Sequence, residues 1–291
     1  FTLNGDNTEY SVSDCLTSAS GSLEIPSVFN GLPVTSIGVG AFGSCASLTS
    51  ISIGNGVTSI ERSAFYGCSS LTSIIIPDSV TSVEDGTFES CTSLTSATIG
   101  DSVTSIGEDA FNGCSSLTSI NIPDSVTSIG VGAFNGCSSL TSITVGDNLT
   151  SIAKKVFSGT NISYDYTADN LNYLISRSGQ SAYLIDGASA SGAVNIPNQV
   201  NTAYVKLIRD GAFASCTSLT SITIPDSVTS IGEDAFYDCT SLTSITIGNG
   251  VTSIAGRAFY GCSSLTSITF EGDAPTFGSD VFTGSDSATV Y

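Results

Sequence analysis

Nine cysteines are the residues whose chemistry could first define a function in this 291-residue chain. Eight of them follow a phenylalanine by three residues: Cys45, Cys68, Cys91, Cys114, Cys137, Cys216, Cys239 and Cys262. Cys15 lies outside this spacing. The sequence has no His and no Cys-x-x-Cys pair, so it lacks the usual ligands of a zinc site. We expect no metal and no cofactor. A shared position beside Phe favours buried, reduced thiols over disulfides.

The sequence contains no recognisable catalytic set. The absence of His removes the commonest general base. A Gly-x-Gly-x-x-Gly match over residues 38–43 has no counterpart in the sister segment, which reads Gly107-Glu-Asp-Ala-Phe-Asn112. An isolated match of this kind carries little weight without its strand and helix. We therefore expect a protein that is not an enzyme.

The charge is strongly acidic. Lys and Arg number 7 and Asp and Glu number 26, which gives a formal net charge of −19. Nucleic acids and anionic membrane surfaces both require basic surfaces, so neither is an expected partner. No apolar run approaches the roughly 18 residues of a membrane span, so no membrane insertion is expected.

Serine and threonine recur in pairs between buried hydrophobic positions. The pairs are Ser96 and Thr98, Ser142 and Thr144, Ser221 and Thr223, Ser244 and Thr246, and Ser267 and Thr269. Neighbouring strands lie about 4.8 Å apart, so these hydroxyls would form two parallel files on an exposed strand face. Ile75 and Asn121 interrupt the files. Such a grid resembles the ice-binding face of β-solenoids, although Ser and Thr are also ordinary residues for an exposed strand face.

Basic and tyrosine residues concentrate between residues 154 and 209. The candidate contact residues are Lys154, Lys155, Tyr164, Tyr166, Tyr173, Arg177, Tyr183, Tyr204, Lys206 and Arg209. Tyr and Arg are enriched in recognition hot spots, so this segment is a candidate binding surface. The alternative is a β-hairpin whose tyrosines cover exposed core. Asn148 and Asn161 begin N-glycosylation sequons, which have meaning only in a secreted eukaryotic protein.

A repeated unit of 23 residues must position all of these side chains. Phenylalanines recur at this interval from Phe42 to Phe157 and again from Phe213 to Phe282. Each unit reads Leu-x-x-Ile-x-Ile-Pro-x-x-Val-x-x-Ile-Gly-x-x-Ala-Phe-x-x-Cys-x-x. Alternation around Leu71, Ile74 and Ile76 predicts a short strand, and Glu108-Asp109-Ala110-Phe111 is typical of one helical turn. One unit can bury its hydrophobic side chains only against its neighbours, which predicts a solenoid.

This unit resembles the BspA-type leucine-rich repeats in its length and in its Ala-Phe and Cys positions. The resemblance implies a mainly β, right-handed solenoid of short parallel strands with one-turn helical segments. The chain length divided by the repeat length predicts about 12 coils. The resemblance also implies an extracellular or cell-surface protein that functions in adhesion or ligand binding, and it implies no catalytic residues.

The spacing divides the chain into five segments. We expect an N-terminal cap over 1–25, a first array over 26–160, longer degenerate coils over 161–210, a second array over 211–274 and a C-terminal cap over 275–291. The expected function is a non-catalytic extracellular scaffold that binds a protein or glycan surface, with possible self-association. The alternatives are a structural subunit of an extracellular assembly or filament, and an ice-binding protein that uses the Ser-x-Thr files.

Overall fold

The computed structural model describes residues 1–285 and 287–291. The chain divides into two compact units, which are described separately below. Unit 1 comprises residues 1–148 and 155–163, and unit 2 comprises residues 149–154 and 164–291. Short β-strands and turns build both units, and no helix occurs among the described residues. The expected fold class, a mainly β solenoid of short parallel strands, is confirmed.

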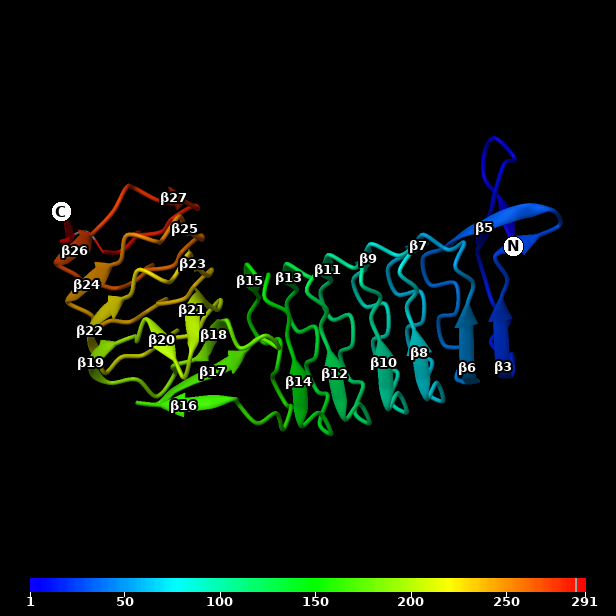
Figure 1. The fold of residues 1–291 in the computed structure, drawn as a ribbon, viewed down its shortest axis with the longest axis horizontal. Coiled ribbons are helices and arrows are strands. Elements are labelled where there is room, and N and C mark those ends of the chain that lie inside the picture. The colour runs from blue at the N-terminus through cyan, green and yellow to red at the C-terminus, as the bar shows by residue number, and fades with distance from the viewer. Residues whose placement is uncertain (286) are drawn as a thin grey trace. The chain divides into compact units, whose positions relative to one another are not determined.

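Unit 1 consists of short strands separated by turns (Figure 1). Its strands are β1 (Thr2–Leu3), β2 (Tyr10–Val12), β3 (Ser20–Ile25), β4 (Val28–Phe29), β5 (Leu32–Ile37), β6 (Ser47–Ile53), β7 (Ser59–Ile60), β8 (Ser73–Ile75), β9 (Ser82–Val83), β10 (Ser96–Thr98), β11 (Ser105–Ile106), β12 (Ser119–Asn121), β13 (Ser128–Ile129) and β14 (Ser142–Thr144). Strands of successive turns pair in parallel and in register. Ser96 pairs with Ser73, and Ser105 pairs with both Ser82 and Ser128. Equal repeat lengths produce this register, because equivalent residues of successive coils are 23 positions apart and therefore lie beside each other on neighbouring strands.

The Ala-Phe segments form turns that bond to the next coil, where the sequence predicted one helical turn. In the segment around Phe111, the N–H groups of Asp109 and Phe111 donate to Val131 and Ala133 of the following coil, at 2.9 and 2.8 Å. An α-helix would direct these N–H groups to carbonyls four residues earlier in the same segment. Asp109 also has a φ of 52°, which lies outside the helical range. The one-turn helical segments are therefore replaced by turns that continue the hydrogen bonding between coils.

Unit 2 combines regular coils with an antiparallel insertion. Its strands are β15 (Ser151–Ile152), β16 (Tyr166–Ala168), β17 (Leu171–Ile175), β18 (Ser181–Asp186), β19 (Gly192–Asn195), β20 (Gln199–Val200), β21 (Ala203–Ile208), β22 (Leu219–Ile224), β23 (Ser230–Ile231), β24 (Ser244–Ile247), β25 (Ser253–Ile254), β26 (Ser267–Phe270), β27 (Thr276–Phe277) and β28 (Thr289–Val290). One parallel sheet has the order β19-β22-β24-β26-β28. In the other sheet, β16, β17 and β18 pair antiparallel, and β18 then joins β21, β23, β25 and β27 in parallel. The extra residues of the degenerate segment thus form a β-meander.

Columns of stacked phenylalanines form the centre of each core. In unit 1 the ring centroids of Phe65, Phe88 and Phe111 are separated by 5.3 and 5.2 Å, and all three side chains are 0% exposed. In unit 2 the rings of Phe213 and Phe236 lie 4.8 Å apart. These spacings are close to the distance between neighbouring strands, so the stacking follows from the repeat itself.

Candidate functional site

Two of the predicted contact residues belong to the core of unit 2. Tyr173 on β17 is 1% exposed, and Tyr183 on β18 is 0% exposed. Their strands form the antiparallel hairpin that the sequence allowed as the alternative. The structure therefore removes both tyrosines from the list of residues that can touch a partner. They were misassigned because composition alone does not reveal which face of a strand a tyrosine occupies.

Lys154 is engaged in an ion-pair network within unit 2. Its Nζ lies 3.2 Å from Oδ2 of Asp234, and Nη2 of Arg257 lies 3.0 Å from the same oxygen. Nη2 of Arg257 also contacts Oε1 of Glu233 at 2.6 Å. The two carboxylates neutralise the two cations, so Lys154 offers little unpaired charge to a partner. The sequence could not show that Lys154 lies beside Asp234, because the two residues are 80 positions apart.

Arg209 supports the inserted strands. Its Nε donates to the carbonyl of Ile185 at 2.6 Å, and Nη1 donates to the carbonyl of Ala153 at 3.5 Å. Burial lowers the pKa of Arg209 from its ordinary value, although Asp186 opposes the effect. Burial likewise raises the pKa of the neighbouring Tyr164. Arg209 and Tyr164 are half-buried and bonded or packed within the fold, which makes both of them structural residues rather than contact residues.

Tyr204 and Lys206 are presented together on the outward face of β21. Tyr204 is 46% exposed, and Lys206 Nζ lies 5.4 Å from the centroid of its ring. The alternating residues Val205 and Leu207 point into the core, at 0% and 2% exposure. A strand anchored in this way holds an aromatic ring and a cation in a fixed geometry. This Tyr204–Lys206 pair is the part of the predicted segment that retains both an exposed ring and a cation beside it.

The remaining predicted contact residues differ in their exposure. Lys155 and Arg177 are exposed. Tyr166 is half-buried and packs against Tyr173 with ring centroids 6.1 Å apart. Because Tyr173 and Tyr183 are buried as well, the ten predicted residues do not all belong to one exposed surface.

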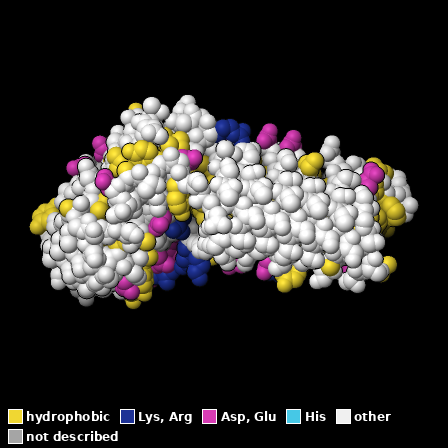
Figure 2. Space-filling model, turned by 90° about the horizontal axis from the view of Figure 1, so that it is seen from below, with side chains coloured by type: hydrophobic (Ala, Val, Ile, Leu, Met, Phe, Trp, Pro, Cys, Tyr) yellow, Lys and Arg dark blue, Asp and Glu magenta, His cyan; other side chains and the backbone are white. Residues whose placement is uncertain are grey.

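The Ser-x-Thr files lie on the strand faces where the sequence placed them, but their exposure differs between the units. In unit 1, Ser96, Thr98, Ser142 and Thr144 are exposed. In unit 2, parallel pairing aligns Ser221 with Ser244 and Ser267, and aligns Thr223 with Thr246 and Thr269. Of these six residues, Thr223 alone is exposed and the others are half-buried. Figure 2 shows a face on which polar uncharged groups and backbone predominate.

Two further sets of threonines have a structural role that the sequence did not reveal. These threonines follow the Leu or Val of each repeat, and their hydroxyls donate to backbone carbonyls of the preceding coil. Thr95 Oγ1 bonds to Thr72 at 3.0 Å, and Thr104 Oγ1 bonds to Thr81 at 3.1 Å. The recurring Thr-Ser dipeptide was the available signal, because a threonine hydroxyl at a fixed position of each repeat can bond to the coil before it.

The eight in-phase cysteines are buried free thiols, five of them in a column in unit 1 and three in a column in unit 2. Within the column in unit 1, Cys68 Sγ donates to the carbonyl of Phe42 at 3.2 Å, and Cys91 Sγ donates to that of Phe65 at 3.2 Å. Cys15 is half-buried, and both it and Cys45 direct their thiols to the carbonyl of Leu16, at 3.4 and 3.6 Å. The sequence placed Cys15 outside the repeat, whereas the fold brings it beside the first member of the column in unit 1.

The two sequon asparagines are exposed but hydrogen-bonded. Asn148 Nδ2 donates to the carbonyl of Asp124 at 2.9 Å, and Asn161 Nδ2 donates to that of Ser138 at 2.7 Å. Each bond ties the asparagine to the preceding coil. Attachment of a glycan at either nitrogen would have to disturb that contact.

The repeat family follows from the sequence match together with this geometry. A family model described as the BspA type leucine rich repeat region matches six copies, over residues 25–176 and 190–291. The chain belongs to this family. Its solenoid coils and in-phase Phe and Cys columns are thus the repeat units of a BspA type protein. No catalytic activity is named for the family or for the similar structures described next.

Several crystal structures of bacterial repeat proteins are similar to this BspA type chain. A leucine-rich repeat protein from Bacteroides ovatus is 28% identical over 93% of this chain and 76% of its own, with a TM-score of 0.44. A leucine rich cell surface protein from Faecalibacterium prausnitzii is 29% identical over 100% of this chain and 91% of its own, with a TM-score of 0.38. The pneumococcal vaccine antigen PcpA is 18% identical over 99% and 76%, with a TM-score of 0.40. A search of curated proteins gave no match.

Neither a metal cluster nor a membrane span is found in the described part of this BspA type chain. Among residues 1–285 and 287–291, no group of three or more His, Cys, Asp and Glu side chains is arranged to hold a metal ion. Over the same residues, no helix has the length and hydropathy needed to cross a membrane.

Asp210 should make the stability of unit 2 depend on pH. Burial raises the pKa of Asp210 from 3.8 to about 6. Folding therefore favours the protonated acid, and this stabilisation is full below about pH 4 and is lost as the pH rises through about 6. We expect Asp210→Asn to be more stable than wild type by about 1–2 kcal/mol at pH 8, with the difference shrinking toward pH 4.

Urea denaturation at pH 4, 6 and 8 measures this difference. The asparagine can still accept the hydrogen bond that Glu233 N–H donates to Asp210 Oδ1 at 2.8 Å. Asp226→Asn is a matched control, because Asp226 is exposed and accepts a comparable bond from Asn249 N–H at 2.9 Å. A constant difference between wild type and Asp210→Asn across this pH range would contradict the assignment.

Proposed function

We propose that this protein is a non-catalytic repeat scaffold, displayed outside the cell, that binds an anionic protein or glycan surface through the Tyr204–Lys206 pair. The observation that carries the proposal is the position of this pair on β21. The strand is anchored by core residues on its inner face and presents a ring and a cation on its outer face. The extracellular location is part of the proposal and is the location that the family resemblance implies.

The charge distribution supports an anionic ligand at this position. The chain as a whole carries a net charge of −19, so most of its surface repels anions. In unit 2, Lys154 and Arg257 are paired with carboxylates, and Arg209 donates to backbone carbonyls. Lys206 instead lies above an exposed aromatic ring. A ligand that combines an acidic group with an apolar face can contact both side chains at once.

Two other functions remain proposals with different expected behaviour. A structural subunit would associate through surfaces of this chain itself, and analytical ultracentrifugation would show assemblies that grow with concentration. An ice-binding protein would require a continuous hydroxyl grid. Ile75 is 66% exposed and interrupts the files in unit 1, while most of the grid in unit 2 is half-buried. These observations favour binding at the Tyr204–Lys206 pair over ice binding.

Substitution of this pair should weaken binding without unfolding the protein. We expect Lys206→Glu to lower affinity for an anionic surface about 10-fold or more, because it reverses the charge beside the ring. Tyr204→Ala should lower affinity similarly, since the ring contributes contact area. Immobilised heparin and an uncharged dextran serve as the two probes, with binding followed by surface plasmon resonance at 50 and 300 mM salt. Wild-type binding to heparin should weaken at the higher salt.

Lys155→Glu is the matched control, because it makes the same change of charge at an exposed position of unit 1. Circular dichroism and melting temperature confirm that each variant is folded. Equal losses in Lys155→Glu and Lys206→Glu would show that only net charge matters. Binding that is unaffected by either change at the Tyr204–Lys206 pair would place the ligand site elsewhere.

A further inference from the structure

The N-terminal end of unit 1 brings one accessible thiol beside one buried thiol. Cys15 lies in the connection between β2 and β3, and Cys45 lies in the turn before β6. Leu16 O accepts from Cys15 Sγ at 3.4 Å and from Cys45 Sγ at 3.6 Å. The two sulfurs therefore lie no further apart than the sum of these distances. Neighbouring coils are about 4.8 Å apart, which is within the range of Cα separations that a disulfide spans.

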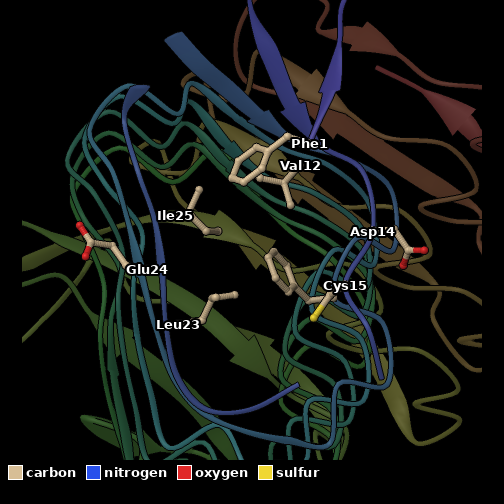
Figure 3. Close-up of a pocket in the computed structure, with 8 residues that line it drawn as sticks. Phe1, Val12, Asp14, Cys15, Leu23, Glu24 and Ile25 are labelled. Atoms are coloured by element: carbon tan, nitrogen blue, oxygen red, sulfur yellow. The ribbon is translucent and has the colours of Figure 1, made fainter. Parts of the chain in front are cut away.

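An apolar pocket gives access from solvent to Cys15, one member of this pair. The pocket has a volume of about 190 Å³, and Cys15 lines it together with Phe1, Val12, Leu23 and Phe42. In Figure 3 the side chains of Phe1, Val12 and Leu23 point toward the pocket, whereas Asp14 and Glu24 point away from it. Cys15 is half-buried, but Cys45 is 0% exposed. A small oxidant can thus reach Cys15 first, and Cys45 only through Cys15.

We propose that Cys15 and Cys45 form a redox pair that closes into a disulfide and ties the N-terminal segment to the first repeat. The oxidant belongs to the class of small disulfides, such as oxidised glutathione. The inference is independent of the ligand site on unit 2.

The reaction proceeds by two thiol–disulfide exchanges. The Cys15 thiolate attacks one sulfur of the oxidant, which forms a mixed disulfide and releases one thiolate. Cys45 then loses its proton and attacks the Cys15 sulfur, which forms the Cys15–Cys45 bond and releases the second thiolate. The protein loses two electrons and two protons, and the oxidant becomes two thiols. The pKa of Cys45 is raised to about 12, mainly by burial and to a smaller extent by the neighbouring Cys15 thiol. Because only the thiolate attacks, the second step should accelerate as the pH rises.

Among the remaining column cysteines, Cys216 lines a pocket of the described chain, and the thiol of the next coil, Cys239, is 0% exposed. Cys68, Cys91, Cys114, Cys137, Cys239 and Cys262 are all 0% exposed, and Cys216 is 3% exposed. Each of these buried thiols also donates to a backbone carbonyl, as Cys114 does to Phe88 at 3.2 Å. A disulfide between two of them would begin at a thiol that is 3% exposed or less, whereas the Cys15–Cys45 bond begins at the half-buried Cys15.

Peptide mapping of the oxidised protein tests the proposal directly. The native chain is incubated with oxidised glutathione at pH 8, alkylated, and digested after glutamate. Cleavage at Glu9, Glu24, Glu61 and Glu84 places Cys15, Cys45 and Cys68 in three different peptides. We expect a linked product of peptides 10–24 and 25–61, with the mass of two hydrogens lost. Its yield should fall at least 10-fold in Cys15→Ala and remain at the wild-type level in the control Cys91→Ala.

A second measurement reports the consequence for folding. The closed loop contains β3, β4 and β5, so the disulfide should raise the melting temperature of unit 1 by several degrees, and a reductant should reverse the change. A link between Cys45 and Cys68 would overturn the proposal. So would a mixed disulfide at Cys15 that never resolves, or no reaction at Cys15. These outcomes are read on the wild-type chain and do not depend on the folding of any variant.

Discussion

Phe111→Ala should lower the free energy of unfolding of unit 1 by about 3–5 kcal/mol. The Phe111 ring is 0% exposed and stacks between Phe88 and Phe134, with centroid distances of 5.2 and 5.3 Å. Removing the ring leaves a cavity and also removes the support of both neighbouring rings. Because each coil packs chiefly on its neighbours, the loss should spread along the unit. Equilibrium denaturation in urea measures the change.

Ser119→Ala is the appropriate control for this substitution. Ser119 lies on the exposed face of β12, within ten residues of Phe111, and removing its hydroxyl leaves the core unchanged. The expected change is within about 0.5 kcal/mol. If Phe111→Ala and Ser119→Ala cost the same, the phenylalanine column would not be the main source of stability in unit 1.

Gly187→Ala should destabilise unit 2 by about 2–3 kcal/mol, through overpacking rather than through a cavity. A Cβ at Gly187 would clash with Cε1 of Phe213. Phe213 is 0% exposed and stacks on Phe236 with centroids 4.8 Å apart, so its ring cannot move without displacing its neighbour. Hydrogen exchange should show the loss of protection in β21 and β22, and urea denaturation should give its size.

Ser189→Ala tests whether the effect arises from the ring contact. Ser189 is exposed in the turn that follows Gly187, so its substitution samples the same segment without touching Phe213. We expect its stability to match wild type within about 0.5 kcal/mol. Phe213→Leu combined with Gly187→Ala should restore part of the lost stability, because the smaller side chain frees the space that the Cβ takes. No rescue would contradict the steric explanation.

Periodic residues made most of the fold predictable. Phe, Cys, Leu and Ile recur every 23 residues, and a repeated unit has only one way to bury the same side chains in every coil. The burial of the eight in-phase cysteines and the outward position of residues such as Ser96 and Thr98 follow from that rule. The helical turn expected at Glu108–Phe111 did not form. The carboxylates of Glu108 and Asp109 would stabilise the N-terminal end of a helix. The N–H groups of Asp109 and Phe111 instead donate to carbonyls of the next coil.

The candidate site was less predictable because it lies where the repeat is interrupted. The sequence located the concentration of tyrosine and basic residues, but an irregular segment has no period from which the inner and outer faces can be deduced. The structure buries Tyr173 and Tyr183, bonds Arg209 to backbone carbonyls, and leaves Tyr204 with Lys206 on the surface. Tyr204 and Lys206 are on the surface because alternate residues of β21 face outward. That strand is defined by its pairing with β18 and β23, which the sequence does not show.

The sequence by itself determined the repeat family, the mainly β solenoid and the identity of the core columns, because identical coils repeat identical burial. Only the tertiary structure decided which non-repeating residues meet. Lys154 contacts Asp234, 80 positions away, and Cys15 and Cys45 both bond the carbonyl of Leu16. Such contacts depend on how each irregular segment folds back on the regular coils. That path is set by the packing of many side chains together and has no signature in the local spacing of residues.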